Sequence, residues 1–505
     1  MIADSQDSLL PTSPNPKKSE GIPFFHLLKN AIPFMLNNLA YFGARNISYH
    51  FLKESNESHL IAAAGLALTC INVISVALAG SLNVGLTSRA AQAFGAKEYR
   101  LIGIYLHRAS IIGAIVMIPC NIALYFIDRI FINFGYDAET VENARLICIY
   151  SYPGIFGWIV SNTITSYLTA CDLFKPPAIV TTICAVINCI ASYVTIYLFD
   201  LGIIGFAMSF NIQNVFGAIL LVVYVKVKDP VPGSIFWLNK ESFQSLWEFF
   251  KFEFSAGAMI FVEWVSWEVL YALSGAIGVT ELSSFTIVLN NFTLMYVPNF
   301  AIMDTAIVFV GNSMGENNPQ KAKNYVKAAI LASSSFLLLS EIFYIFFVYQ
   351  VMEFYTDDPK TIELSVAVMR LYQIVMIADF IQLNLMGCLR SIGYERVGSI
   401  LMTVSYYVIG IPLCFVLALK EKLGLLGIGY GHIVIVYIIL FGLLIVYACF
   451  VDWEKQAKII SDKIKKDSRA VTLEDLGENL IQNRPKSSSI NEDAEGGSAI
   501  NAAWI

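Results

Sequence analysis

Charged residues are scarce in this chain. Asp, Glu, Lys and Arg make up only 14% of its 505 residues, against about 25% in an ordinary soluble domain. Hydrophobic residues make up 56%, so the chain has too little polar surface for a soluble fold of its size. This composition excludes an ordinary cytosolic enzyme and indicates a polytopic membrane protein. The net charge of −6 also argues against nucleic acid as a partner.

The sequence also lacks the motifs of metal-binding and ATP-driven proteins. No CxxC pair occurs among its nine cysteines, which argues against a disulfide framework and against a zinc site. No HExxH motif is present, and the five histidines are not spaced as metal ligands. A Walker A loop is missing too, so we do not expect the chain to hydrolyse ATP. We therefore expect a protein that is not an enzyme and that needs no metal or cofactor.

Long apolar runs dominate what is present. Twelve stretches of about 20 or more residues are each long enough to cross a bilayer as a helix. They span residues 24–50, 60–84, 101–127, 145–169, 177–199, 203–225, 247–275, 282–309, 326–350, 364–389, 397–419 and 426–450. The sequence therefore predicts an all-α protein with twelve transmembrane helices.

The distribution of positive charge predicts the orientation of these helices. If both ends of the chain are cytoplasmic, the inner loops hold thirteen Lys and Arg residues and the outer loops five. This is the bias expected from the positive-inside rule. We expect cytoplasmic tails at 1–23 and 452–505, both mostly disordered because they are polar. Residues 455–466 can extend the last helix as a basic amphipathic segment. The pattern does not distinguish the plasma membrane from an internal membrane.

Two pairs of matching segments indicate an internal repeat. Gln92 precedes Gly95 by three residues, and Asn312 precedes Gly315 in the same way, 220 positions later. A second pair, 200–205 and 422–427, repeats at an offset of 222. We infer duplication of a six-helix unit, a design that transporters use for alternating access. The halves are an N-terminal lobe at 24–228 and a C-terminal lobe at 247–451, joined by a cytoplasmic linker at 229–246.

Acidic residues within the spans are confined almost entirely to the second half. A carboxylate at mid-membrane costs at least ~2.5–3.5 kcal/mol, so each one is a candidate functional residue. The candidates are Glu253, Glu263, Glu268, Asp304, Glu341 and Asp379. If protons or other cations drive a transport cycle, we expect their site in the C-terminal lobe.

Position along the spans separates these acids. Glu263 and Asp379 lie near the middle of their spans, so we expect them to share one cavity. Glu268 follows Glu263 by five residues and points about 140° away, so the same contact is not expected for both. Asp304 lies in the inner third of its span, where a vestibule would hydrate it. Glu253 lies near an inner end, where a solvated charge is the simpler interpretation.

Aromatic side chains flank the acids of the seventh span. Trp264, Trp267 and Tyr271 lie within eight residues of Glu263. Aromatic faces attract organic cations, and a carboxyl group beside them can exchange a proton for such a cation. Aromatic residues make up 13% of the chain, so packing against helices or lipid is the competing interpretation for each of them.

Several segments together resemble the eukaryotic branch of the multidrug and toxic compound extrusion (MATE) transporters. The run 261–268 (FVEWVSWE) resembles that family's Glu-Trp-Trp-x-x-Glu element in span 7. Val297-Pro298 and the segment 310–315, with Gly311, Asn312 and Gly315, resemble its span 8 and the following loop. The segments 92–96 and 387–393 resemble its first-half loop motif and the end of its span 10. They occur in the family's order over residues 24–450.

The resemblance implies two six-helix lobes, related by a pseudo-two-fold axis, around a central cavity. It also implies efflux of organic cations or other amphiphiles in exchange for protons, or for sodium in some branches. Glu263 and Glu268 match the two acids of span 7 that handle substrate and proton. Asp379 falls where mammalian members have a glutamate. Asn290 falls at the position of a span 8 glutamate, so one acid is lost.

Other functions stay open at this point. A lipid or lipid-linked precursor flippase of the wider superfamily is the first alternative, although acidic cavity candidates disfavour an anionic lipid. A polytopic membrane enzyme or a receptor is less consistent with acids scattered at mid-depth. A scaffold without transport activity would follow if the lost acid reflects lost coupling. We expect a monomer in the bilayer, with a small organic cation or amphiphile as its partner.

Overall fold

A computed structural model of the protein describes residues 22–54, 58–133 and 137–482. Helices account for all the regular secondary structure in this part of the chain. Ten of them are long and apolar enough to cross a membrane by length and composition. Two further helical segments, α1 (Phe24–Glu54) and the pair α6 (Ala138–Tyr150) and α7 (Tyr152–Ala170), complete the twelve crossings. The predicted fold class is thus confirmed.

The N-terminal lobe contains the first six crossings. After α1, the second crossing is α2 (Ser58–Ile71), which continues through a π-helical turn into α3 (Leu78–Gly95). The third is α4 (Tyr99–Tyr125), followed by the short α5 (Ile127–Asn133). The α6–α7 pair is the fourth, and the last two are α8 (Lys175–Ser192) and α9 (Gly202–Lys228).

The C-terminal lobe repeats this arrangement. Its first four crossings are α10 (Leu246–Ile277), α11 (Val279–Gly315), α12 (Pro319–Glu353) and α13 (Pro359–Ser391). The next crossing combines α14 (Glu395–Thr403), α15 (Ile411–Phe415) and two π-helical segments, and the last is α16 (Gly424–Ile445). A final helix, α17 (Trp453–Gln482), lies outside the lobes.

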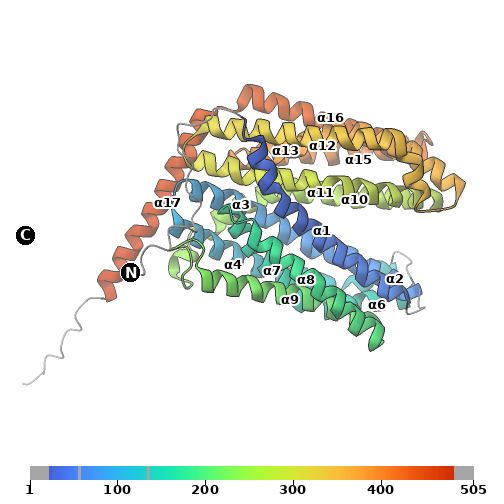
Figure 1. Ribbon diagram of the computed structural model, residues 1–505, viewed down its shortest axis with the longest axis horizontal. Coiled ribbons are helices and arrows are strands. Elements are labelled where there is room, and N and C mark those ends of the chain that lie inside the picture. The colour runs from blue at the N-terminus through green and yellow to red at the C-terminus, as the bar shows by residue number, and fades with distance from the viewer. Residues whose placement is uncertain (1–21, 55–57, 134–136, 483–505) are drawn as a thin grey trace, which may run out of the picture.

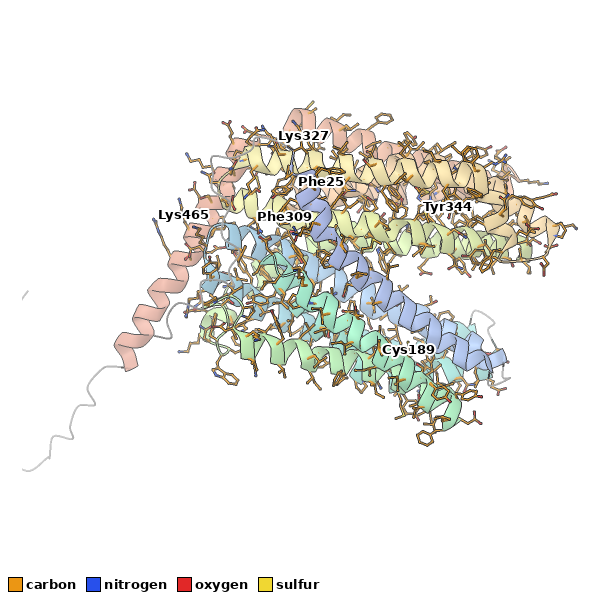
Figure 2. The ribbon with its side chains drawn as sticks, in the orientation of Figure 1. Phe25, Cys189, Phe309, Lys327, Tyr344 and Lys465 are labelled. Atoms are coloured by element: carbon orange, nitrogen blue, oxygen red, sulfur yellow. The ribbon has the colours of Figure 1, made fainter. Side chains whose placement is uncertain are left out.

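The two lobes meet at one end and diverge towards the other (Figure 1). They meet at the end where α17 lies, which we call the closed end, and they separate towards the end that carries α2 and α6. Helix α1 crosses between them, packing against α8 of its own lobe and against α11 of the other. Apolar side chains project outwards from both lobes (Figure 2). Phe346 on α12 and Ile190 on α8 are 69% and 58% exposed, as expected for helices that face lipid.

Backbone conformation confirms the internal repeat. Lys97 and Asn317, 220 positions apart, adopt φ values of 63° and 56°. Gly202 and Gly424, 222 positions apart, adopt φ values of 49° and 57°. A residue other than glycine in this left-handed region is uncommon. Two such turns at matching positions therefore show that both halves reverse the chain in the same way.

The two loop motifs found in the sequence contact each other at the closed end. A Cβ atom on Gly95 would clash with the backbone carbonyl of Asn312, and one on Gly315 would clash with the carbonyl of Gln92. The side chains reach across in a similarly reciprocal way. Gln92 Nε2 donates to the Ser391 carbonyl at 2.8 Å, and Asn312 Nδ2 donates to Asp172 Oδ1 at 2.7 Å. These motifs, with Gly311 packed on Ala91, are therefore the contact between the lobes.

Two sequence predictions need correction. The tail after residue 452 was predicted to be mostly disordered, but α17 continues from Trp453 to Gln482. Its buried Ala457, Ile460 and Ile464 explain why it docks. Glu253 was interpreted as a solvated charge, yet it is 1% exposed and packs against Gly85 of α3. The tail segments 1–21 and 483–505 lie outside the described residues.

Removing the polar atoms of Glu253 should stabilise the protein. In the described structure neither of its carboxylate oxygens has a hydrogen-bond partner, and a buried polar group without one costs about 1–3 kcal/mol. Methionine has a shape similar to that of glutamate but carries no carboxyl group. We therefore expect Glu253→Met to raise the melting temperature of the protein in detergent. Thermal unfolding followed by fluorescence would measure this. A melting temperature lowered by several degrees would show that the carboxyl group makes a stabilising contact.

Candidate functional site

A cavity of about 270 Å³ lies between the two lobes. Helices α1, α3 and α7 and the π-helical turn between α2 and α3 form one wall, and α10, α11 and α13 form the other. The N-terminal wall carries neutral polar and aromatic groups, whereas the C-terminal wall carries the charges. The polar, charged and large aromatic residues are Asn38, Ser81, Trp158, Asn162, Glu263, Trp264, Phe300, Asp304 and Arg390.

A second cavity of about 220 Å³ adjoins the first within the C-terminal lobe. Glu263, Trp264 and Phe300 line both cavities. Its other walls include Trp267, Glu268 and Tyr296, so aromatic faces surround the acids. Glu263 is therefore the one acidic residue that lines both of these cavities.

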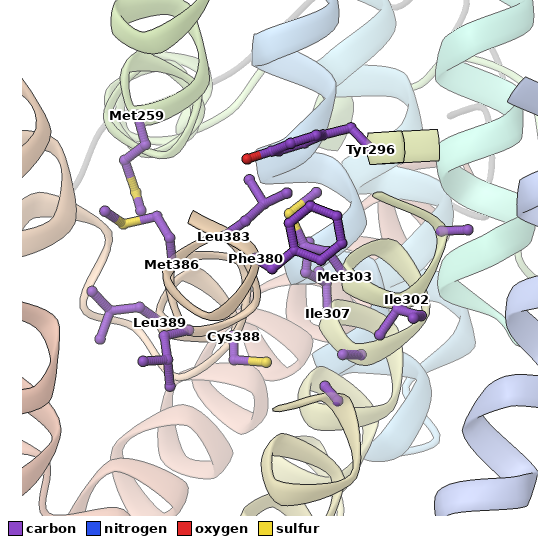
Figure 3. Close-up of a cluster of buried hydrophobic side chains, with 14 of the residues drawn as sticks. Met259, Tyr296, Ile302, Met303, Ile307, Phe380, Leu383, Met386, Cys388 and Leu389 are labelled. Carbon is purple, nitrogen blue, oxygen red and sulfur yellow. The ribbon is translucent and has the colours of Figure 1, made fainter. Parts of the chain in front are cut away.

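Asp379 lies behind the cavity wall instead of on its surface. Its side chain is 1% exposed and accepts hydrogen bonds from Tyr296 Oη and from Gln382 Nε2. Tyr296 lines the second cavity and packs edge-on against Phe380 with 4.9 Å between ring centroids (Figure 3). Asp379 also interacts electrostatically with Glu263. The structure thus brings the two acids together, but Tyr296 separates Asp379 from the cavity.

The other residues predicted on α10 divide into two groups. Trp264, Trp267 and Glu268 line the second cavity together with Glu263. Glu268 thus shares a cavity with Glu263 despite the angle between them, because both border the same opening. Trp267 also packs on His432, with ring centroids 4.4 Å apart. Tyr271 lines neither cavity, and its hydroxyl accepts a hydrogen bond from Thr286 at 3.2 Å.

The two polar positions predicted on α11 differ in their surroundings. Asp304, which was predicted to lie in a vestibule, lines the cavity between the lobes. Asn290 is exposed and lines neither cavity, and its neighbour Asn291 is buried and accepts a hydrogen bond from Tyr344 at 3.2 Å. The position of the lost acid therefore lies outside the walls of both cavities.

Arg390 is a site residue that the sequence reasoning missed. It was counted among the charges of the inner loops, but its side chain is 2% exposed and lines the cavity between the lobes. Its guanidinium interacts electrostatically with Asp304 and Glu263. The predicted span ended at residue 389, whereas α13 continues to Ser391 and so includes Arg390 in the helix. The site thus contains a buried positive charge beside its acids.

Asp172 is a titratable group of the contact between the lobes, and it lies outside the membrane-spanning helices. Asp172 lies in the turn between α7 and α8, where burial raises the pKa of its carboxyl group to about 7, while the hydrogen bond from Asn312 opposes the rise. Lys321 also opposes the rise, and Glu316 adds to it. If the lobes separate at this end, water reaches Asp172 and its pKa returns to near 3.9. The Asp172 carboxyl group therefore binds its proton more tightly when the lobes are in contact than when they are apart.

We expect the closed contact to weaken as the pH rises. The raised pKa of Asp172 means that closure is favoured at acid pH and that this advantage is lost between about pH 4 and pH 7. Asp172→Asn keeps an oxygen that can accept from Asn312 but does not titrate, so the dependence should vanish. Spin-label distances across the closed end between pH 5 and pH 8 would measure it. The same pH profile in both proteins would contradict this role of Asp172.

The architecture and the site define a class of protein. Twelve membrane-crossing helices in two repeated lobes, with an acid-lined cavity between them, are the architecture of a membrane transporter. A family model described as MatE matches residues 33–194 and 255–416, more than half of the chain. The chain therefore belongs to the MatE family of multidrug and toxin extrusion transporters and is not an enzyme. The two matches begin 222 positions apart, which is the offset of the repeat.

Relatives and solved structures support this assignment. Multidrug and toxin extrusion protein 1 of Xenopus tropicalis is 25% identical over 432 residues, covering 86% of this chain and 75% of the relative. Protein DETOXIFICATION 9 of Arabidopsis thaliana is 27% identical over 407 residues, covering 79% and 83%. The crystal structure of the eukaryotic MATE transporter AtDTX14 superposes with a TM-score of 0.82 at 21% identity, covering 87% and 99%. The resemblance seen in the sequence is thus confirmed.

Proposed function

We propose that the protein exports organic cations or other amphiphiles in exchange for protons by alternating access. The observation that carries this proposal is the position of Glu263, which lines both cavities among Trp264, Trp267 and Tyr296. A carboxylate in such a place binds either a proton or an organic cation, and aromatic faces add attraction for the cation. The charges of Asp304 and Arg390 adjust the balance in the same cavity. Sodium is the alternative coupling ion.

Both termini are placed in the cytoplasm in this proposal. The support is the excess of Lys and Arg in the loops on the side of the termini. The closed end then faces the cytoplasm, and the lobes diverge towards the outside (Figure 1). The arrangement corresponds to the stage of the cycle at which substrate leaves and a proton binds. Each chain contains both lobes, so the monomer is proposed as the working unit.

Transport in liposomes tests this function. Purified protein would be reconstituted into vesicles that are acidic inside, and uptake of a radiolabelled quaternary ammonium ion would be followed without sodium and then with it. We expect uptake driven by the pH gradient alone. Uptake of the labelled cation only in the presence of a sodium gradient would show that sodium, and not the proton, is the coupling ion. Absence of coupled movement for several cations would contradict the proposal and lead to a flippase assay with labelled lipids.

A further inference from the structure

Helix α17 spans the closed end and contacts both lobes (Figure 1). It packs against α11 and α12 of the C-terminal lobe and against α3 and α4 of the N-terminal lobe. Alternating access requires the lobes to separate at this end once in every cycle. A helix that contacts both of them must therefore leave one lobe whenever the end opens.

The attachment of α17 to the C-terminal lobe is extensive. The Trp453 and Tyr447 ring centroids lie 6.0 Å apart. Lys323 Nζ of α12 lies over the Trp453 ring, 5.9 Å from its centroid. Ala457 and Ile460 are among the buried apolar residues of the first half of the helix. The chain also runs from α16 through the short π-helical segment Val446–Phe450 into α17. This half of α17 therefore moves with the C-terminal lobe.

The attachment to the N-terminal lobe includes two polar contacts. Tyr105 Oη of α4 donates to Asp467 Oδ2 at 3.0 Å. Ser468 Oγ donates to Glu98 Oε2 at 2.6 Å, just before α4 begins. The net stabilisation from a hydrogen bond is modest, because both groups bond to water once they separate. These contacts are the ones that break when the lobes part.

We propose that α17 is a detachable clamp on the cytoplasmic end and that Ser468 is a phosphorylation site whose modification releases it from the N-terminal lobe. The inference rests on the proposed function for its sidedness and for the opening of this end. Ser468 is half-buried, and Lys465 and Lys466 precede it by three and two residues. Serine kinases that select basic residues upstream of the target recognise this pattern.

The chemistry of release follows from the contact with Glu98. The Ser468 hydroxyl oxygen attacks the γ-phosphorus of ATP, ADP leaves, and the hydroxyl proton passes to the kinase. The product loses the donor that bonded Glu98 and gains about 1.5 to 2 negative charges beside that carboxylate. Asp467, the preceding residue, adds a further acid. Repulsion then separates α17 from α4, and the equilibrium shifts towards the state that is open to the cytoplasm.

Distances across the closed end test the clamp in the full-length chain without substrate or gradient. Spin labels would be placed at Lys175→Cys of α8 and Gln320→Cys of α12, in a background with the exposed Cys449 replaced by serine. We expect Ser468→Glu to raise the ratio of open to closed populations about tenfold, while Ser461→Glu, on the same helix, leaves it unchanged. Tyr105→Phe should raise it in the same direction.

A second substitution tests whether repulsion between the two acids causes the release of α17. Adding Glu98→Gln to Ser468→Glu removes the repelling partner and should restore most of the closed population. A Ser468→Glu distance distribution equal to that of the unmodified protein, or a shorter one, would overturn the proposal. If the distances respond as expected but vesicles show no proton-coupled uptake, the clamp stands and the proposed transport function fails. Tyr105→Phe keeps the clamp testable if the Ser468→Glu variant does not fold.

Discussion

Replacing Glu263 by glutamine should reduce gradient-driven exchange by about two orders of magnitude or more, comparable to the loss of a proton-transfer group. Glutamine keeps the size and the hydrogen-bonding oxygen of the side chain but can neither ionise nor release a proton. Glu263 lines both cavities, so no other acid in their walls occupies an equivalent position. Uptake of a labelled organic cation into acidic-inside vesicles would measure the effect.

The matched control for this substitution lies on α12. Glu341 is an acid in the same lobe whose Oε2 accepts a hydrogen bond from Gln373 at 3.0 Å, and it lines neither cavity. Glu341→Gln should therefore transport normally. Asp379→Asn should lose exchange as Glu263→Gln does, because Asp379 interacts with Glu263 and is held by Tyr296. Normal transport by both Glu263→Gln and Asp379→Asn, with normal expression, would show that the site is placed wrongly.

Adding a methyl group at the contact between the lobes should prevent closure and abolish transport. Gly95→Ala and Gly315→Ala each direct a Cβ atom into a backbone carbonyl of the opposite lobe, that of Asn312 and of Gln92 respectively. A backbone carbonyl at a helix end cannot rotate away as a flexible side chain can. The lobes must therefore stay apart at this end. The spin labels at Lys175→Cys and Gln320→Cys should then report only the long distance.

A control glycine separates this effect from a general loss of stability. A Cβ atom on Gly65 of α2 would meet nothing within 4 Å in the described structure, so Gly65→Ala should leave both distances and transport unchanged. A short distance retained by Gly95→Ala would mean that the backbone at the contact shifts to accept the methyl group. In that case closure does not depend on the glycines.

The repeat was visible in the sequence because turns depend on local chemistry. The two loop motifs at an offset of 220 predicted a duplication, and the φ values of Lys97 and Asn317 confirm it. Their reciprocal contact was not predictable. A motif specifies its own backbone conformation, whereas its partner is selected by the packing of helices that are distant in the chain.

For the acids within the membrane, too, the sequence predicted one part of the site and the packing of the helices decided the rest. Insertion cost marks Glu263 and Asp379 as unusual from sequence alone, and both lie at the candidate site. The sequence did not reveal that Tyr296 stands between Asp379 and the cavity, nor that Arg390 points into it. A helix that is apolar on all sides gives no periodic signal for the face turned to the cavity, because lipid and protein interior accept the same residues.

The amino-acid sequence by itself determined the membrane class, the twelve crossings, the duplication and the two central acids. These properties follow from hydropathy and local turn chemistry, which act within each segment. Only the tertiary structure decided which residues meet across the lobes, such as Gly95 with Asn312, and how α17 docks against Tyr105 and Glu98. Those contacts join segments hundreds of residues apart, and their free energy comes from close packing and complementary polar groups that no single segment contains.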